Sequence, residues 1–85
     1  MKHEIKLPPL GETMEEGTVL QWFKSEGDPI ENKDPLYEIE TDKTTMEVES
    51  TEEGYVRELR VDEGETIDVG TVVAVITDDP DETLD

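Results

Sequence analysis

The chain has no cysteine and a single histidine, and both scarcities narrow the chemistry it can perform. Without cysteine there are no disulfide bonds and no metal site with thiolate ligands. His3 is close to the amino terminus, and Ser25 and Ser50 have no neighbouring base in the sequence, so no nucleophile and base are paired. The acidic segments also lack the EF-hand spacing of calcium sites. The sequence therefore predicts a domain without enzymatic activity and without a metal.

Basic residues are scarce as well. Seven Lys and Arg stand against 25 Asp and Glu, which gives a formal net charge of −18 at pH 7. This charge repels nucleic-acid phosphates and anionic lipid headgroups. We therefore expect neither nucleic acid nor membrane as a partner. The ordinary interpretation is a solvated acidic surface, and the alternative is steering toward basic patches on larger proteins.

Long apolar runs are absent too. No segment approaches the roughly 20 apolar residues that span a bilayer, and the opening "MKHEIKLPPL" lacks the apolar stretch of a secretory signal. At 85 residues the chain has room for one small core. The last eight residues, "DDPDETLD", have Leu84 as their one apolar side chain. We predict a soluble domain over residues 1–78 and the start of a flexible acidic linker over residues 79–85.

What the sequence does contain is a series of short apolar runs between glycine and proline turn signals. No window shows a sustained helical period, so the pattern predicts an all-β fold. Bulges are expected within 19–23 and 36–39, where strict alternation fails. Trp22, Met14 and Met46 are interpreted as core side chains. The predicted strands are 2–7, 17–24, 36–41, 45–50, 54–61 and 72–77, with very short ones near 29–31 and 66–68.

The sequence also repeats itself. Residues 16–42 align with residues 53–79 at a constant offset of 37 and without a gap. Two copies are too few for a solenoid, which needs at least about three stacked units, so we expect them to pair around a pseudo-twofold axis. The identical pairs are Glu16/Glu53, Gly17/Gly54, Val19/Val56, Glu26/Glu63, Gly27/Gly64, Ile30/Ile67, Ile39/Ile76 and Asp42/Asp79.

Lys43 is the only cation between Asp34 and Arg57, and it lies where two predicted strands meet in "EIETDKTTMEVE". The short connection predicts a hairpin with Asp42 and Lys43 at its exposed tip. From spacing alone, a solubilising turn lysine is favoured over a lysine displayed for a function.

Three runs change that balance: "GETMEEGTVLQWFKSEGDPI", "LYEIETDKTTMEVES" and "EGETIDVGTVVAVI". Together they resemble the lipoyl domain of the dihydrolipoyl acyltransferase component of 2-oxo acid dehydrogenase complexes, over residues 4–77. In that family the lipoylated lysine follows an aspartate at a hairpin tip, and Asp42 and Lys43 match those positions. The resemblance implies a flattened β-barrel or sandwich of two four-stranded antiparallel sheets with pseudo-twofold symmetry. It also implies lipoic acid, amide-linked to Lys43, as the cofactor.

The resemblance further implies a swinging-arm carrier that moves acyl groups and reducing equivalents between active sites. Its partners would be a thiamine-dependent 2-oxo acid decarboxylase, an acyltransferase core, dihydrolipoyl dehydrogenase and lipoate ligase. "TMEEGTV" and "WFKSEGD" favour a pyruvate- or acetoin-type complex. We expect a monomer as an isolated domain, in the cytoplasm of a bacterium or the mitochondrial matrix of a eukaryote. The implied site residues are Lys43, Asp42 and Thr44 at the tip, with Leu10, Gly11, Glu12, Thr13, Met14 and Glu15 for partner recognition.

Two other carriers remain as alternatives. A biotin carboxyl carrier has a similar fold, but it carries methionine on both sides of its acceptor lysine, where this chain has Asp42 and Thr44. A glycine-cleavage lipoyl carrier is longer and resembles the first 35 residues less well. A purely structural interaction module would tolerate replacement of Lys43 without loss of any carrier function.

Overall fold

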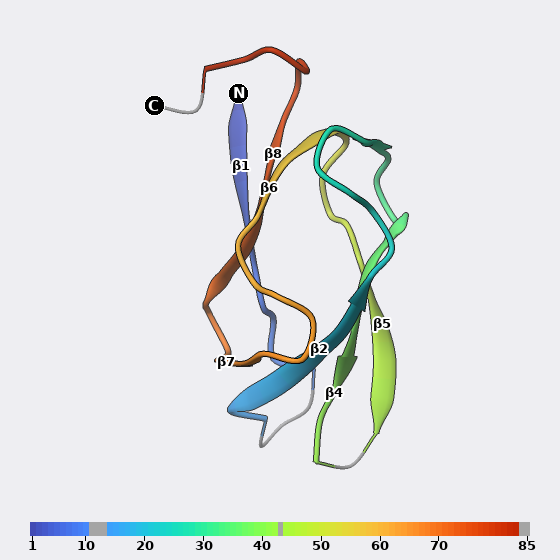
Figure 1. Cartoon of the computed structure of the whole chain (residues 1–85), viewed down its shortest axis with the longest axis vertical. Coiled ribbons are helices and arrows are strands. Elements are labelled where there is room, and N and C mark those ends of the chain that lie inside the picture. Colours follow the sequence, from blue (N-terminus) through green and yellow to red (C-terminus); the bar gives the residue numbers. More distant parts are fainter. Residues whose placement is uncertain (11–13, 43, 84–85) are drawn as a thin grey trace.

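The computed structural model describes residues 1–10, 14–42 and 44–83, and these residues form strands and turns with no helix. None of the described segments could therefore cross a membrane as a helix. All the predicted strands are present, with ends shifted by up to two residues (Figure 1). The strands are β1 Lys2–Lys6, β2 Glu16–Trp22, β3 Pro29–Ile30, β4 Pro35–Glu40, β5 Thr45–Glu49, β6 Gly54–Leu59, β7 Thr66–Asp68 and β8 Val72–Thr77.

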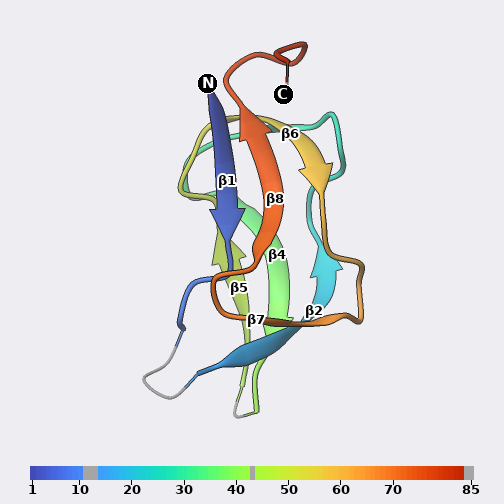
Figure 2. The ribbon, with the colours of Figure 1, turned by 90° about the vertical axis from the view of Figure 1, so that its left-hand side faces the viewer.

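The strands make two four-stranded antiparallel sheets that face each other. One has the order β1-β8-β6-β3 and the other β5-β4-β2-β7. Figure 2 shows β1, β8 and β6 side by side, with β5, β4 and β2 behind them. No strand belongs to both sheets, so the molecule is a flattened sandwich rather than a closed barrel. The predicted fold class is confirmed.

The internal repeat appears in the structure as a shared topology. The offset of 37 carries β2 onto β6, β3 onto β7 and β4 onto β8, and exchanging β1 with β5 turns one sheet order into the other. The bulges follow the same rule. A register shift at 19–21 recurs at 56–58, and a shift at 35–37 recurs at 72–74. The predicted bulges within 19–23 and 36–39 are confirmed, and their recurrence shows that the two copies share backbone detail.

The core lies between the sheets and is built from inward-facing aliphatic side chains of both copies. In β5, Val48 is buried while the glutamates on either side of it are exposed, as the alternation predicted. Trp22, Met14 and Met46 are partly buried and pack against the core, which confirms their interpretation as core side chains. The Trp22 indole N–H donates to the Val61 carbonyl at 2.8 Å.

The outer face of β8 is covered by charged side chains. Val75 is fully buried, and its neighbours across the sheet are Glu4 on β1 and Glu58 on β6. Directly opposite residues in antiparallel strands lie on one face of the sheet. The Arg60 guanidinium pairs with Glu58 at 3.0 Å and with Glu4 at 4.0 Å, so it passes over Val75. The side chains of Arg60, Glu4 and Glu58 therefore shield the outer face of β8 from water. This shielding explains how the strand "VVAVI" can be apolar on both of its faces.

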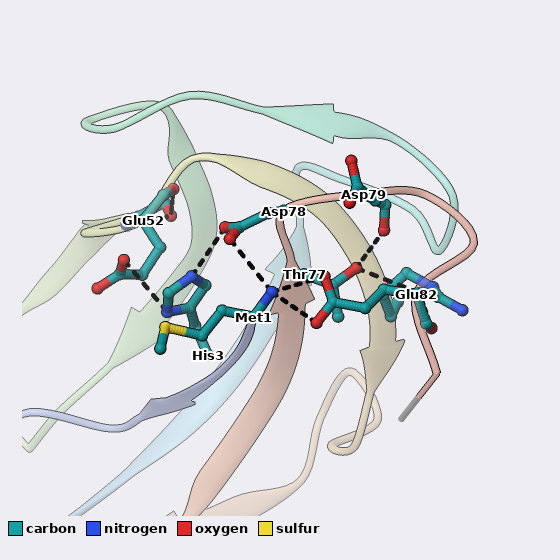
Figure 3. A network of polar contacts seen from close by, with 9 residues as sticks. Met1, His3, Glu52, Thr77, Asp78, Asp79 and Glu82 are labelled. Atoms are coloured by element: carbon teal, nitrogen blue, oxygen red, sulfur yellow. Dashed lines mark hydrogen bonds and ion pairs between the residues drawn. The ribbon is translucent and has the colours of Figure 1, made fainter. Parts of the chain in front are cut away.

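The start of β1 and the segment that follows β8 lie at one end of the sandwich, and the end of β4 and the start of β5 lie at the other (Figure 1). At the terminal end the His3 ring is placed between two carboxylates, with Nε2 3.0 Å from Asp78 and Nδ1 3.4 Å from Glu52 (Figure 3). The contact with His3, together with the amino-terminal ammonium, lowers the pKa of Asp78. Arg57 donates to the Glu82 carbonyl at 2.6 Å. The first residues of the predicted linker therefore turn back and contact β6, while the position where flexibility begins stays a prediction.

Candidate functional site

The candidate site is the hairpin turn between β4 and β5. The ladder of these strands ends at the pair Glu40 and Thr45. Beyond it the Thr41 N–H donates to the Thr44 carbonyl at 2.8 Å, which brings the two strands together at the turn. Asp42 and Thr44 are both exposed, as predicted for a hairpin tip. Lys43 lies outside the described residues, so its assignment as the attachment site stays a prediction.

The side chains of the turn add further hydrogen bonds. The Thr41 hydroxyl lies 3.1 Å from the Thr44 carbonyl oxygen, to which it can donate, and it accepts the Thr44 N–H at 3.2 Å. The Thr44 hydroxyl donates to the Thr45 carbonyl at 3.4 Å. Thr41 thus contacts Thr44 through both its main chain and its side chain. Sequence reasoning did not select Thr41, although threonine hydroxyls can bond nearby backbone groups in turns.

A shallow groove runs beside this turn and joins it to the start of β2. Its lining includes Met14 and Glu15 from the predicted recognition segment and Asp42 from the hairpin. The structure therefore places these three predicted residues at the same end of the molecule, while Gly11, Glu12 and Thr13 lie outside the described residues. The full described lining is Met14, Glu15, Glu16, Gly17, Thr18, Glu40, Thr41, Asp42 and Thr66.

Packing fixes the described ends of the recognition segment. Leu10 and Met14 are partly buried against the core, and the Leu10 N–H lies 3.2 Å from the Met14 sulfur. Gly17 makes room for Met14, because a Cβ at position 17 would lie 3.2 Å from the Met14 Cε and 2.8 Å from the Ile39 Cδ1. Met14 of the segment and Ile39 of β4, the strand that leads into the turn, thus both lie close to Gly17 of β2.

The groove is acidic and has no described basic side chain in its lining. Four of its lining residues carry carboxylates, and its polar neutral groups include Thr18 and Thr66, whose hydroxyl oxygens are 2.8 Å apart. Thr66 reaches the groove through the pairing of β7 with β2, which the local sequence could not indicate. Across the described ranges no cluster of three or more His, Asp or Glu could hold a metal ion. The geometry suits an exposed attachment point beside a polar surface that another protein can contact.

Comparison with known proteins agrees with this geometry. A family model named Biotin_lipoyl and described as "Biotin-requiring enzyme" matches residues 3–76. The dihydrolipoyllysine-residue acetyltransferase component of the pyruvate dehydrogenase complex of Corynebacterium glutamicum is 45% identical over 78 residues, which are 92% of this chain and 12% of that protein. The pyruvate dehydrogenase E1 component subunit beta of Rhizobium meliloti is 48% identical over 80 residues, 93% of this chain and 17% of that protein. This chain thus spans less than a fifth of either relative.

Among solved structures, the lipoyl domain of the 2-oxoglutarate dehydrogenase complex from Azotobacter vinelandii superposes with a TM-score of 0.71 at 34% identity. The match covers 87% of this chain and 94% of that domain, so the likeness is to a whole domain. The family expected from the sequence is confirmed. The match of the family model to nearly the whole chain, together with these relatives, shows that the chain belongs to the biotin/lipoyl domain family.

Proposed function

We propose that this chain is a lipoyl carrier domain and that lipoic acid is attached through an amide bond to Lys43. The observation that carries the proposal is the exposed β4–β5 turn closed by Thr41 and Thr44, in a fold shared with a lipoyl domain. Lys43 is the only lysine in residues 34–56 and therefore the only one that this hairpin can present. Asp42 and Thr44 on either side of it are exposed, which fits an attachment point that enzymes must reach.

When bound, the lipoyl group would supply a dithiolane that accepts an acyl group together with two electrons. The protein's own part is to present and to tether it. The turn and the segment after β8 lie at opposite ends of a body 38 Å long. A linker joined after residue 82 would hold one end while the turn points away from it. Tethering of this kind raises the effective concentration of the arm at several active sites.

The proposed partners follow from this role. They are a thiamine-dependent 2-oxo acid decarboxylase, an acyltransferase core and dihydrolipoyl dehydrogenase, with lipoate ligase as the modifying enzyme. Relatives named as parts of pyruvate and 2-oxoglutarate dehydrogenase complexes support the class of complex. We propose that the parent chain is a dihydrolipoyl acyltransferase and that this domain catalyses no step itself. The segment of residues 10–15, which meets Asp42 at the groove, is the proposed surface for decarboxylase recognition.

A biotin carrier is the second candidate, because the matching family model covers both kinds of attachment domain. The residues next to the acceptor lysine favour lipoate, since Asp42 and Thr44 stand where biotin carriers have methionine. Parallel incubation of the chain with a lipoate ligase and with a biotin ligase separates the two. Gain of one lipoyl mass with little biotin supports the proposal, and stoichiometric biotinylation contradicts it.

The attachment site is tested by Lys43→Arg, which keeps the charge and removes the amine that forms the amide. We expect complete loss of lipoylation, with thermal unfolding unchanged, because the neighbouring Asp42 and Thr44 are exposed and a tip lysine is not expected in the core. Lys33→Arg is the matched control, since Lys33 is also an exposed lysine in a turn. Intact mass spectrometry after treatment with ligase gives the answer. A Lys43→Arg variant that still gains one lipoyl mass would show that the assignment is wrong.

A further inference from the structure

The β4–β5 turn is closed mainly by one residue. Thr41 makes three contacts with Thr44: its N–H donates to the Thr44 carbonyl at 2.8 Å, its hydroxyl lies 3.1 Å from the same oxygen, and its hydroxyl oxygen accepts the Thr44 N–H at 3.2 Å. Two of the three depend on the hydroxyl. In the sequence these contacts span Asp42 and Lys43. A side chain at the end of β4 therefore helps to hold together the backbone on the two sides of these residues.

The chemistry of threonine suits this task. Its hydroxyl is a donor and an acceptor at once, so it can serve the carbonyl and the N–H of one residue together. Its branched Cβ limits rotation about χ1, which keeps the hydroxyl pointed at the turn. Thr41 is partly buried on the side of the groove, whereas Thr44 is exposed. Thr41, at the end of β4, is thus the more buried residue of the pair, and it holds the exposed Thr44.

The second copy of the repeat has no equivalent of this closure among the described residues. The offset of 37 places Asp78 at the position of Thr41 and Pro80 at the position of Lys43. The Asp78 carboxylate contacts His3 and the amino terminus, and its described contacts do not close a turn (Figure 3). The hydroxyl closure therefore belongs to the end of the molecule that carries Lys43.

We infer that Thr41 is a positioning residue for the modification of Lys43, an inference that rests on the proposed lipoylation. In that reaction the neutral Nζ forms an amide bond to the carboxyl carbon of a lipoyl adenylate, an acyl adenylate that the ligase makes from lipoate and ATP. The bond from this carbon to the phosphate oxygen breaks, AMP leaves with its electron pair, and the nitrogen releases one proton. A ligase that accepts one turn geometry binds with an apparent affinity reduced by the fraction of molecules in other geometries. Thr41 keeps that fraction small.

The variant Thr41→Val removes the hydroxyl and keeps the branched shape and the main-chain hydrogen bond. We expect the KM of the ligase for the domain to rise about ten-fold, the effect of losing hydrogen bonds of ordinary net strength, while kcat changes little. Thr41→Ser restores the hydroxyl without the branched Cβ and should bring the KM back toward that of the unaltered chain. Thr45→Val makes the same chemical change at the first residue of β5, whose hydroxyl has no hydrogen bond among the described residues, and it should leave the KM as it is.

A second measurement follows the turn without any ligase. Amide hydrogen exchange at Thr44 should accelerate in Thr41→Val and return toward the original rate in Thr41→Ser, because the hydroxyl accepts that N–H. The inference is overturned if the KM is unchanged in Thr41→Val, or if the KM of Thr41→Ser does not return toward that of the unaltered chain. In either case, lipoylation of the unaltered chain still supports the proposed function. If the unaltered chain accepts no lipoate, the proposed function and the inference both fail. Equal thermal unfolding of the valine variants separates loss of the turn from loss of the fold.

Discussion

Replacing Tyr37 by phenylalanine is expected to stabilise this protein. Tyr37 on β4 has no exposed surface, and its ring centroid lies 5.1 Å from that of Trp22. Its hydroxyl is buried with no hydrogen-bonding partner among the described residues. Burial raises the pKa of the phenol far above its usual value, which keeps it neutral but does not provide a partner. A buried hydroxyl without a partner has lost its hydrogen bonds to water and gained none in return.

The expected gain follows from two opposing contributions. An unpaired buried polar group costs about 1–3 kcal/mol, and Tyr37→Phe removes that cost. The space left by one oxygen atom costs roughly 0.5 kcal/mol, at about 24 cal/mol per Å³ of cavity. The net effect is therefore a gain of about 0.5–2.5 kcal/mol in the free energy of unfolding. For a domain of this size that corresponds to a rise of roughly 2–20 °C in Tm.

Urea unfolding followed by fluorescence of Trp22, the only tryptophan, measures this directly. The midpoint should rise with the slope unchanged, because the surface exposed on unfolding stays nearly the same. Tyr55→Phe is the matched control. Tyr55 is partly exposed, so its hydroxyl can meet water and its removal should change the midpoint little. A lower midpoint for Tyr37→Phe would refute the reasoning, because it would mean that the hydroxyl is satisfied in solution.

Two further changes test the two ends of the molecule. Replacing residues 11–15 by a neutral flexible stretch should slow reductive acylation by the matched decarboxylase while lipoylation of Lys43 persists, and an unchanged acylation rate would place recognition elsewhere. Asp78→Asn should lose the stability that the lowered pKa of Asp78 contributes. That contribution is fully present above the pKa that Asp78 has in the unfolded chain, and it is lost as the pH falls through the lower pKa that Asp78 has in the folded protein. The Tm values of the two proteins, measured over about pH 2–6, should therefore converge in acid. Parallel curves would contradict the role of the contact with His3.

The strands could be predicted because their signals are local. Turn glycines, prolines and apolar runs lie within a few residues of each strand. Because the sequence repeats at an offset of 37, the strands predicted in one copy could also be compared with those in the other. The bulges were located to within a few residues, since loss of alternation shows that a register changes but not at which residue. The hairpin tip followed from the shortness of its connection. These features needed no knowledge of which strands pair.

The rest of the candidate site depends on contacts between distant parts of the chain. Thr66 lines the groove only because β7 pairs with β2, and Arg57 reaches the Glu82 carbonyl only because the tail turns back after β8. No local pattern encodes such pairings. From the sequence, Thr41 is only the last residue of the predicted strand 36–41, and its hydroxyl has no assigned role. The backbone groups that the Thr41 hydroxyl bonds could be identified only from the three-dimensional structure of the turn.

The repeat also explains how one small fold can have two ends with different tasks. Two related copies place equivalent positions at opposite ends, after β4 and after β8. At the first, Thr41 closes a hairpin and the next strand follows at once. At the second, Asp78 bonds instead to the amino-terminal strand, and Pro80 stands where a modifiable amine would be. Because proline has no side-chain amine, Pro80 cannot carry the modification proposed for Lys43. A few substitutions in a common backbone thus suffice to give the proposed carrier one end to modify and one end to tether.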